Sequence, residues 1–191
     1  GAATRSITFG SNTITLTGIS GGSTWGFSIA STNFTFNAGT STIKLTDSTS
    51  SNTSFAGVGK TYNNVWFARG ASTGNITISG NNTFADLKDD GSAAHSILVT
   101  AASTQTFTTF TVSGASGAAI TINSTTTGVH NLIKAGGGTI NRDWLNIQHS
   151  IASPAITWYA GTNSVDNQGV ATAGRGWIFT AAPTGVQPTF L

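Results

Sequence analysis

Short runs in which apolar and polar residues alternate recur along most of the chain. The clearest are TITLTG (13–18), TIKLTD (42–47), NITISG (75–80), SILVTA (96–101), AITINS (119–124) and AITWYAG (155–161). An alternation with a period of two is the pattern of a β-strand with one buried face. Turn-forming stretches such as SGNN, DDGS, GASG and AGGG lie between the runs. The pattern therefore predicts many short strands joined by tight turns.

A longer repeat is superimposed on this alternation. Four segments begin with an aromatic residue that is followed three positions later by an apolar one: YNNVWF from Tyr62, FADLKD from Phe84, FTTFTV from Phe107 and WLNIQH from Trp144. Their starts are separated by 22, 23 and 37 positions, and the longest interval contains two additional strand-like pieces, AAITIN and HNLIKAG. A repeat of this length, built from short strands and sharp corners, is typical of a β-solenoid.

In such a fold each coil rises by about 4.8 Å, so that equivalent side chains stack. We expect an internal aromatic ladder of Tyr62, Phe84, Phe107 and Trp144, and beside it a ladder of Val65, Leu87, Phe110 and Ile147. Each fully buried rung contributes roughly 1.5–3 kcal/mol. The alternative fold is a β-sandwich or jelly roll, which also has short alternating strands but would not align the aromatic positions.

The repeat is uneven along the chain, which suggests three parts of one domain. Residues 61–180 are expected to form the solenoid body, and residues 1–60 an N-terminal cap or irregular coils. Residues 181–191 contain Pro183 and Pro188 and are expected to leave the body as a tail or arm, because proline cannot donate to a strand ladder.

The composition supports an all-β protein and excludes several classes. The chain of 191 residues contains no Glu, only 7% charged residues and 9% aromatic residues, so helix formers are scarce and disorder is not expected. It has no Cys, which excludes disulfides and thiolate metal sites. The eight Lys and Arg residues are scattered singly, which argues against a nucleic-acid-binding face. No apolar run is long enough to predict a membrane span.

The six acidic residues are all Asp, and their pattern does not predict a catalytic pair. The densest group is DLKDD, in which Asp86, Lys88 and Asp90 are expected on one side of a strand and Asp89 on the other. In the aromatic alignment Asp86 corresponds to Thr109 and Asn146, so no second carboxylate stacks on it. We therefore expect a solvated turn with local Asp–Lys pairing, no catalytic residues and no enzyme activity.

The remaining candidate chemistry is sparse. His95, His130 and His149 are far apart in different patterns, so neither a metal site nor a cofactor is predicted. Trp66, Trp158 and Tyr159 neighbour core positions in alternating strands, so one of each adjacent pair is expected to face outward, and all three are candidates for exposed aromatic surface. Such residues could bind a glycan or another protein, and the low charge of the surface favours a protein contact.

Much of the chain, residues 22–180, resembles Ser/Thr-rich right-handed parallel β-helix proteins of phage virions and bacterial surface proteins. The segments that carry the resemblance include GSTWGFS (22–28), FNAGTSTIKLTD (36–47), FAGVGKTYNNVWF (55–67), NTFADL (82–87), DWLNIQHS (143–150) and GWIFT (176–180). The resemblance implies a right-handed solenoid and a place on a virion or cell surface. It implies no catalytic residues.

We therefore expect a non-enzymatic structural protein of a tailed-phage virion: a head decoration (cement) protein, a head fibre or a tail-fibre component. It would act through protein–protein contacts as a homo-oligomer, with a trimer among the expected states, and its partners would be other virion proteins and a host surface glycan. The alternatives are a secreted bacterial adhesin or extracellular fibre subunit, placed on the cell surface, and a glycan-degrading β-helix enzyme.

Overall fold

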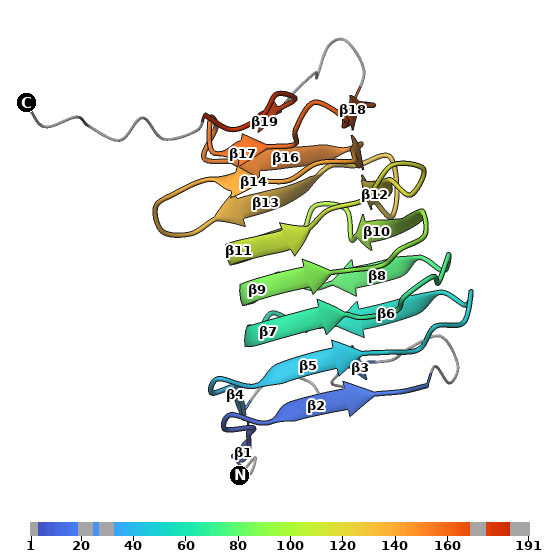
Figure 1. Ribbon diagram of the computed structural model, residues 1–191. Coiled ribbons are helices and arrows are strands. Elements are labelled where there is room, and N and C mark those ends of the chain that lie inside the picture. Colours follow the sequence, from blue (N-terminus) through green and yellow to red (C-terminus); the bar gives the residue numbers. More distant parts are fainter. Residues whose placement is uncertain (1–3, 19–24, 27–32, 169–174, 184–191) are drawn as a thin grey trace, which may run out of the picture.

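The strands of this protein stack into a column of parallel coils. The computed structural model describes residues 4–18, 25–26, 33–168 and 175–183. Every regular element in those residues is a β-strand, and all strand pairings in the sheets are parallel (Figure 1). The fold is thus a parallel β-solenoid, as the repeat predicts, and not a β-sandwich or jelly roll.

Two long sheets form the walls of the column. The front sheet has the order β16-β13-β11-β9-β7-β5-β2 and the back sheet the order β18-β15-β12-β10-β8-β6-β3. The front strands are β2 (Thr13–Leu16), β5 (Thr42–Leu45), β7 (Thr61–Phe67), β9 (Thr83–Asp89), β11 (Thr104–Val112), β13 (His130–Lys134) and β16 (Ser150–Ser153). The back strands are β3 (Trp25–Gly26), β6 (Thr53–Ala56), β8 (Ile76–Ser79), β10 (His95–Val99), β12 (Ile120–Ser124), β15 (Leu145–Ile147) and β18 (Val165–Asp166).

Two smaller sheets lie near the two ends of the column (Figure 1). The N-terminal one consists of β1 (Arg5–Thr8) and β4 (Phe34–Asn37), and the C-terminal one of β14 (Ile140–Asn141), β17 (Trp158–Tyr159) and β19 (Trp177–Ile178). Both long sheets include strands from residues 13–56, so coils of the column are present on the N-terminal side of residue 61. Of the predicted tail, residues 184–191 lie outside the described residues.

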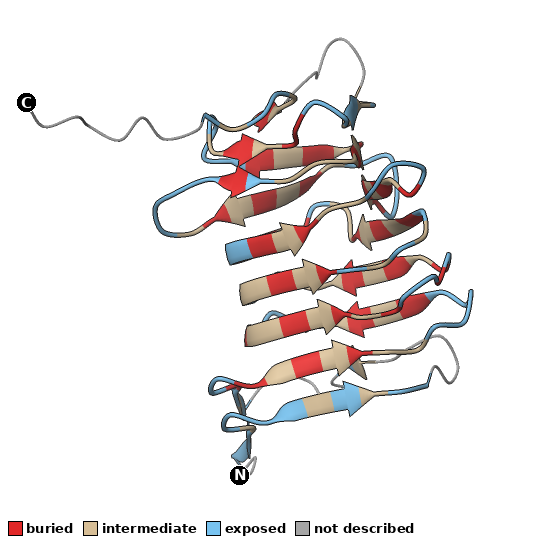
Figure 2. Ribbon diagram, viewed as in Figure 1, coloured by how far each residue is buried: buried red, intermediate tan, exposed pale blue. Residues whose placement is uncertain are grey.

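The aromatic-x-x-apolar motif marks an interruption of the burial alternation in the front strands. In β7 the buried side chains are Tyr62, Val65 and Phe67, whereas Asn63 and Asn64 are both half-buried between them. Two successive residues turned away from the core interrupt the period of two, and β9 repeats the same burial pattern. Figure 2 shows buried and less buried residues alternating along both walls.

Stacked rings fill the middle of the column. The strand register pairs Tyr62 with Phe84 and Phe84 with Phe107, as the spacing predicts. The ring centroids are 5.7 and 5.5 Å apart, and the planes are inclined by only 22° and 13°. The neighbouring column in the same register consists of Val65, Leu87 and Phe110.

The predicted fourth rung is wrong. β13, and not the segment at Trp144, pairs with β11 and sets Lys134 beside Phe107. Trp144 precedes β15 in the back sheet, and Ile147 is buried on that opposite wall. Trp158 packs against Phe107 instead, with ring centroids 6.2 Å apart. The reason is that the interval of 37 residues includes β12, β13 and β14, which is more than one coil.

Candidate functional site

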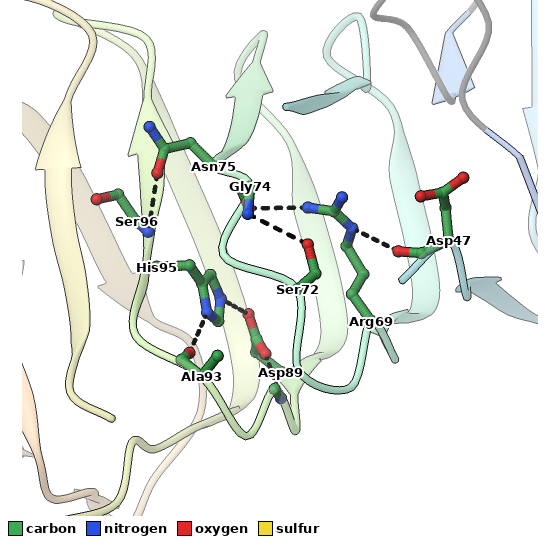
Figure 3. Close-up of polar contacts among 10 residues, drawn as sticks. Asp47, Arg69, Ser72, Gly74, Asn75, Asp89, Ala93, His95 and Ser96 are labelled. Atoms are coloured by element: carbon green, nitrogen blue, oxygen red, sulfur yellow. Dashed lines mark hydrogen bonds and ion pairs between the residues drawn. The ribbon is translucent and has the colours of Figure 1, made fainter. Parts of the chain in front are cut away.

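A buried carboxylate and a buried imidazole form the main cluster of titratable side chains. Asp89 ends β9 in register with Phe67 and Val112, so its carboxylate occupies a position that is apolar in the adjacent coils. His95 begins β10, and its Nε2 lies 2.8 Å from Asp89 Oδ2 (Figure 3). The Gly91 N–H donates to the other carboxylate oxygen at 2.8 Å. The pair therefore fixes the turn that connects the two walls.

Both ring nitrogens of His95 face acceptors. Nδ1 lies 2.9 Å from the carbonyl oxygen of Ala93, while Nε2 faces Asp89. Burial lowers the pKa of His95, but the hydrogen bond and the charge of Asp89 outweigh burial and raise it above 6.5. Both neighbours are acceptors, so both nitrogens can donate only when the ring is protonated, and in that form the ring has no lone pair with which to act as a general base.

Arg69 closes the adjacent corner of the column. It is 3% exposed, and its hydrogen bonds within the described residues all go to backbone carbonyls: Nε to Asp47, Nη1 to Gly74, and Nη2 to Thr49 and Ser51, at 2.7–3.0 Å. Burial lowers the pKa of Arg69, and the charges of Asp47 and Asp89 oppose that shift. The guanidinium thus ties the β5–β6 loop to the β7–β8 connection (Figure 3).

Ser72 lies in the same corner, and its hydroxyl is also used in backbone contacts. Its Oγ donates to the carbonyl of Thr49 at 2.5 Å and accepts the N–H of Gly74 at 3.2 Å. Neither bond involves His95. The arrangement therefore has the geometry of a structural staple rather than of a nucleophile activated by a base.

The sequence contained a usable signal for the buried Asp89–His95 pair. Alternation places Asp89 on the opposite side of its strand from Lys88, and His95 shares the inward phase of Ile97 and Val99. The sequence could not predict their proximity, which depends on the length of the turn between two strands. Arg69 carried no such signal, because its partners are backbone carbonyls.

Asp86 has no acidic neighbour in the coils on either side. The register places it between Asn64 and Thr109, and its Oδ1 accepts a hydrogen bond from the Thr111 hydroxyl at 2.9 Å. Asp90 lies 3.8 Å from Lys88 on the surface, in the local pairing that the sequence predicts. These two carboxylates are thus engaged separately, without the facing pair that glycoside hydrolysis requires.

Trp66 lies on the outer face of the front sheet between two lysines. The register sets Lys44 and Lys88 on either side of it, and their Nζ atoms are 3.9 and 4.0 Å from the ring centroid. Trp66 is half-buried, and its Nε1 has no hydrogen-bond partner among the described residues. Because ammonium groups cover both faces, a sugar cannot stack on this indole as a glycan platform would require.

The other two predicted surface aromatics differ from each other. Trp158 is 0% exposed, so the prediction that it offers binding surface is wrong. Its ring packs against Phe110 and Trp177, and its Nε1 donates to the carbonyl of Ser153 at 2.9 Å. Tyr159 is half-buried on the other side of the same short strand. Alternation therefore holds within this strand, and it turns only one of the two adjacent aromatic residues outward.

The other two histidines lie at the C-terminal part of the column, and His130 is the more buried. His130 is 0% exposed, its Nδ1 lies 2.8 Å from Ser124 Oγ, and its Nε2 has no partner among the described residues. Burial, together with the charge of His149, lowers the pKa of His130 to about 4. The ring of His130 is therefore neutral at neutral pH.

Among the described residues, no three His or Asp side chains come together as a metal site would require. The described part of the chain also contains no helix with the length and hydropathy of a membrane span.

Comparisons with family models, with curated proteins and with solved structures return no match to this chain. What this protein does is therefore inferred from its own fold, side chains and sequence.

Proposed function

We propose that this protein is a non-enzymatic structural protein of a virion surface, which acts through contacts with other virion proteins and with copies of itself. The proposal rests on the resemblance of the chain to phage β-helix proteins and on the low charge of a column of parallel coils. A head decoration protein, a head fibre and a tail-fibre component all fit this description.

The observation that carries the proposal is the outer column Lys44–Trp66–Lys88 on the front sheet. A large aromatic side chain is held between two cations on the outer face of the front sheet, so a partner would lose little conformational freedom in binding it. Tryptophan is also enriched among the residues that dominate protein–protein binding energy. The two ammonium groups favour a partner that offers carboxylates around an apolar spot.

The inner titratable groups support a non-enzymatic role. His95 and Arg69 are saturated by contacts within the fold, and Asp86, on the outer side of β9, has no acidic partner in the adjacent coils. A glycan-degrading enzyme of this architecture would need at least one carboxylate pair open to solvent.

The experiment combines the oligomeric state with binding to particle proteins. We expect sedimentation of the purified protein to show an oligomer, and we expect binding to a shell or tail protein encoded by a neighbouring gene. Trp66→Ala should weaken that binding by about tenfold or more, as loss of a central aromatic contact does. Thr77→Ala, on the outer face of the back sheet, is the matched control and should leave the binding unchanged.

A protein that stays monomeric at high concentration and binds neither shell nor tail protein would contradict the proposal. Neighbouring genes for secretion or cell-wall anchoring, together with binding to cells, would instead indicate an adhesin. Release of reducing sugar from polysaccharides, abolished by Asp86→Ala or Asp90→Ala, would indicate an enzyme.

A further inference from the structure

A polar groove runs along the outer face of the back sheet, on the wall opposite Trp66. It has a volume of about 600 Å³, and Trp144 and the exposed Val165 lie along it together with Asn75, Ser96, Thr121 and Asn146. Among the described residues that line it, His95 is the only titratable one, and both nitrogens of that ring are engaged elsewhere. The groove is therefore lined by uncharged hydroxyl and amide groups beside one indole.

The polar groups in the groove form a regular row. The register pairs Ser96 with Thr121 and Thr121 with Asn146, so their side chains follow one another at about 4.8 Å, the spacing of adjacent strands. All three are half-buried, and none of their side chains has a hydrogen-bond partner among the described residues. They are thus donors and acceptors open to a ligand.

Trp144 is held beside this row by a network around Asp143. The Trp144 N–H donates to Asp143 Oδ1 at 2.9 Å, and the same carboxylate accepts the backbone N–H of Asn163 at 2.9 Å and its Nδ2 at 2.7 Å. The carbonyl of Trp144 accepts the N–H of Ile120 at 3.1 Å. The N–H of Trp144 is therefore fixed by the Asp143 carboxylate and its carbonyl by β12.

The backbone of Trp144 is in the left-handed region, with φ 58°. A bulky side chain there is strained, whereas Gly or Asn would adopt this conformation at lower cost. Strained residues that the surroundings hold in place are concentrated at binding and catalytic sites. The strain at Trp144 thus supports a binding role for its side chain.

We propose that this groove binds a neutral oligosaccharide. The apolar face of a sugar ring would stack on the Trp144 indole, and its hydroxyls would bond to Ser96, Thr121 and Asn146. An acidic polysaccharide fits less well, because no free cation lines the groove within the described part of the chain. An extended peptide also fits less well, because β10, β12 and β15 each pair with strands on both sides and offer no open edge.

Isothermal titration calorimetry on the isolated protein tests this site without any particle protein, so its outcome is separate from that of the proposed function. The probes are hexasaccharides of glucose, mannose and N-acetylglucosamine, with a hexasaccharide of galacturonic acid as the charged comparison. We expect at least one neutral hexasaccharide to bind, and we expect the charged one not to bind.

Trp144→Asn is the informative variant, since Asn tolerates a positive φ and keeps the loop while removing the ring. It should weaken binding by about tenfold or more, whereas Trp66→Ala, on the other wall, should change it by less than about twofold. If Trp144→Asn does not unfold cooperatively, Thr121→Val and Asn146→Ala decide the matter, and each should weaken binding. The proposal is overturned if no neutral hexasaccharide binds, if only the charged one binds, or if the folded groove variants bind like the wild type.

Discussion

At the scale of single residues, two buried histidines respond to pH in opposite directions. His95 gains a carboxylate partner and has a raised pKa, so its contribution to stability is complete below pH 6.5 and is lost as the pH rises through its folded pKa. His130 has no carboxylate partner among the described residues, and burial lowers its pKa. The same residue type therefore stabilises one part of the column in acid and destabilises another.

We predict that His130 makes the protein less stable as the pH falls from 6.5 to 4. The folded pKa is about 4 and the ordinary value is 6.5, so between them the unfolded chain binds more protons than the folded one. Over that range the linked loss is roughly 3 kcal/mol. Urea unfolding at pH 7 and pH 4 should show that the wild type loses about this much more stability than His130→Leu. Equal losses in both proteins would contradict the buried neutral ring.

At the scale of elements, the connection between β9 and β10 depends on one ion pair. Asp89→Asn leaves the imidazolium of His95 buried beside a neutral amide and should destabilise the fold by about 3–5 kcal/mol, as removal of one partner of a buried pair does. The matched control is its neighbour, Asp90→Asn, which breaks only a surface contact with Lys88 and should cost less than about 1 kcal/mol. The urea midpoints of unfolding at pH 6 are compared. Similar shifts of the midpoint in both variants would contradict a special stabilising role for the Asp89–His95 pair.

The regular coils were predictable from the sequence, because the repeat fixes register. Strands expected at 42–47, 75–80, 96–101 and 119–124 are present as β5, β8, β10 and β12. Tyr62, Phe84 and Phe107 stack because intervals of 22 and 23 residues each contain one front strand, one back strand and two corners. Where the number of residues per coil is constant, equivalent residues of adjacent coils stack on each other.

The prediction failed where the coil changes length. WLNI matches the aromatic motif, yet Leu145 is the residue that points inward, beside Ile120 in the back sheet. Trp144 lies just before β15 and has a positive φ, and a single sequence carries no signal of that conformation. Because Trp144 was assigned to the core, the sequence did not predict the groove on the back sheet as a binding site.

At the scale of the whole molecule, each coil is stable only against its neighbours. We predict that deleting residues 85–107, one full coil, leaves a folded column of lower stability. The deletion joins Phe84 to Thr108, which preserves the aromatic-x-x-apolar motif, and it removes Asp89 and His95 together. Urea-gradient electrophoresis should show one cooperative transition at a lower urea concentration than for the wild type.

Deleting residues 85–95 is the matched comparison, because it removes about half a coil. It joins the first two residues of β9, Thr83 and Phe84, to β10 from Ser96 onward and places a front-sheet segment in line with the back sheet. We expect this shorter deletion to abolish the cooperative transition. A half-coil deletion that unfolds as cooperatively as the full-coil deletion would argue that register between coils does not determine the fold.

The stacked rings also make the packing of the core visible by circular dichroism. From Phe9 to Trp177 each aromatic neighbour lies within 4.9–6.4 Å of the next, close enough for their electronic transitions to couple. Ellipticity in the aromatic absorption band reports fixed side-chain packing, whereas the peptide band reports strands. If the aromatic packing loosened while the strands stayed intact, the aromatic-band ellipticity would fall and the peptide-band ellipticity would persist. The two bands therefore distinguish loss of core packing from loss of the sheets.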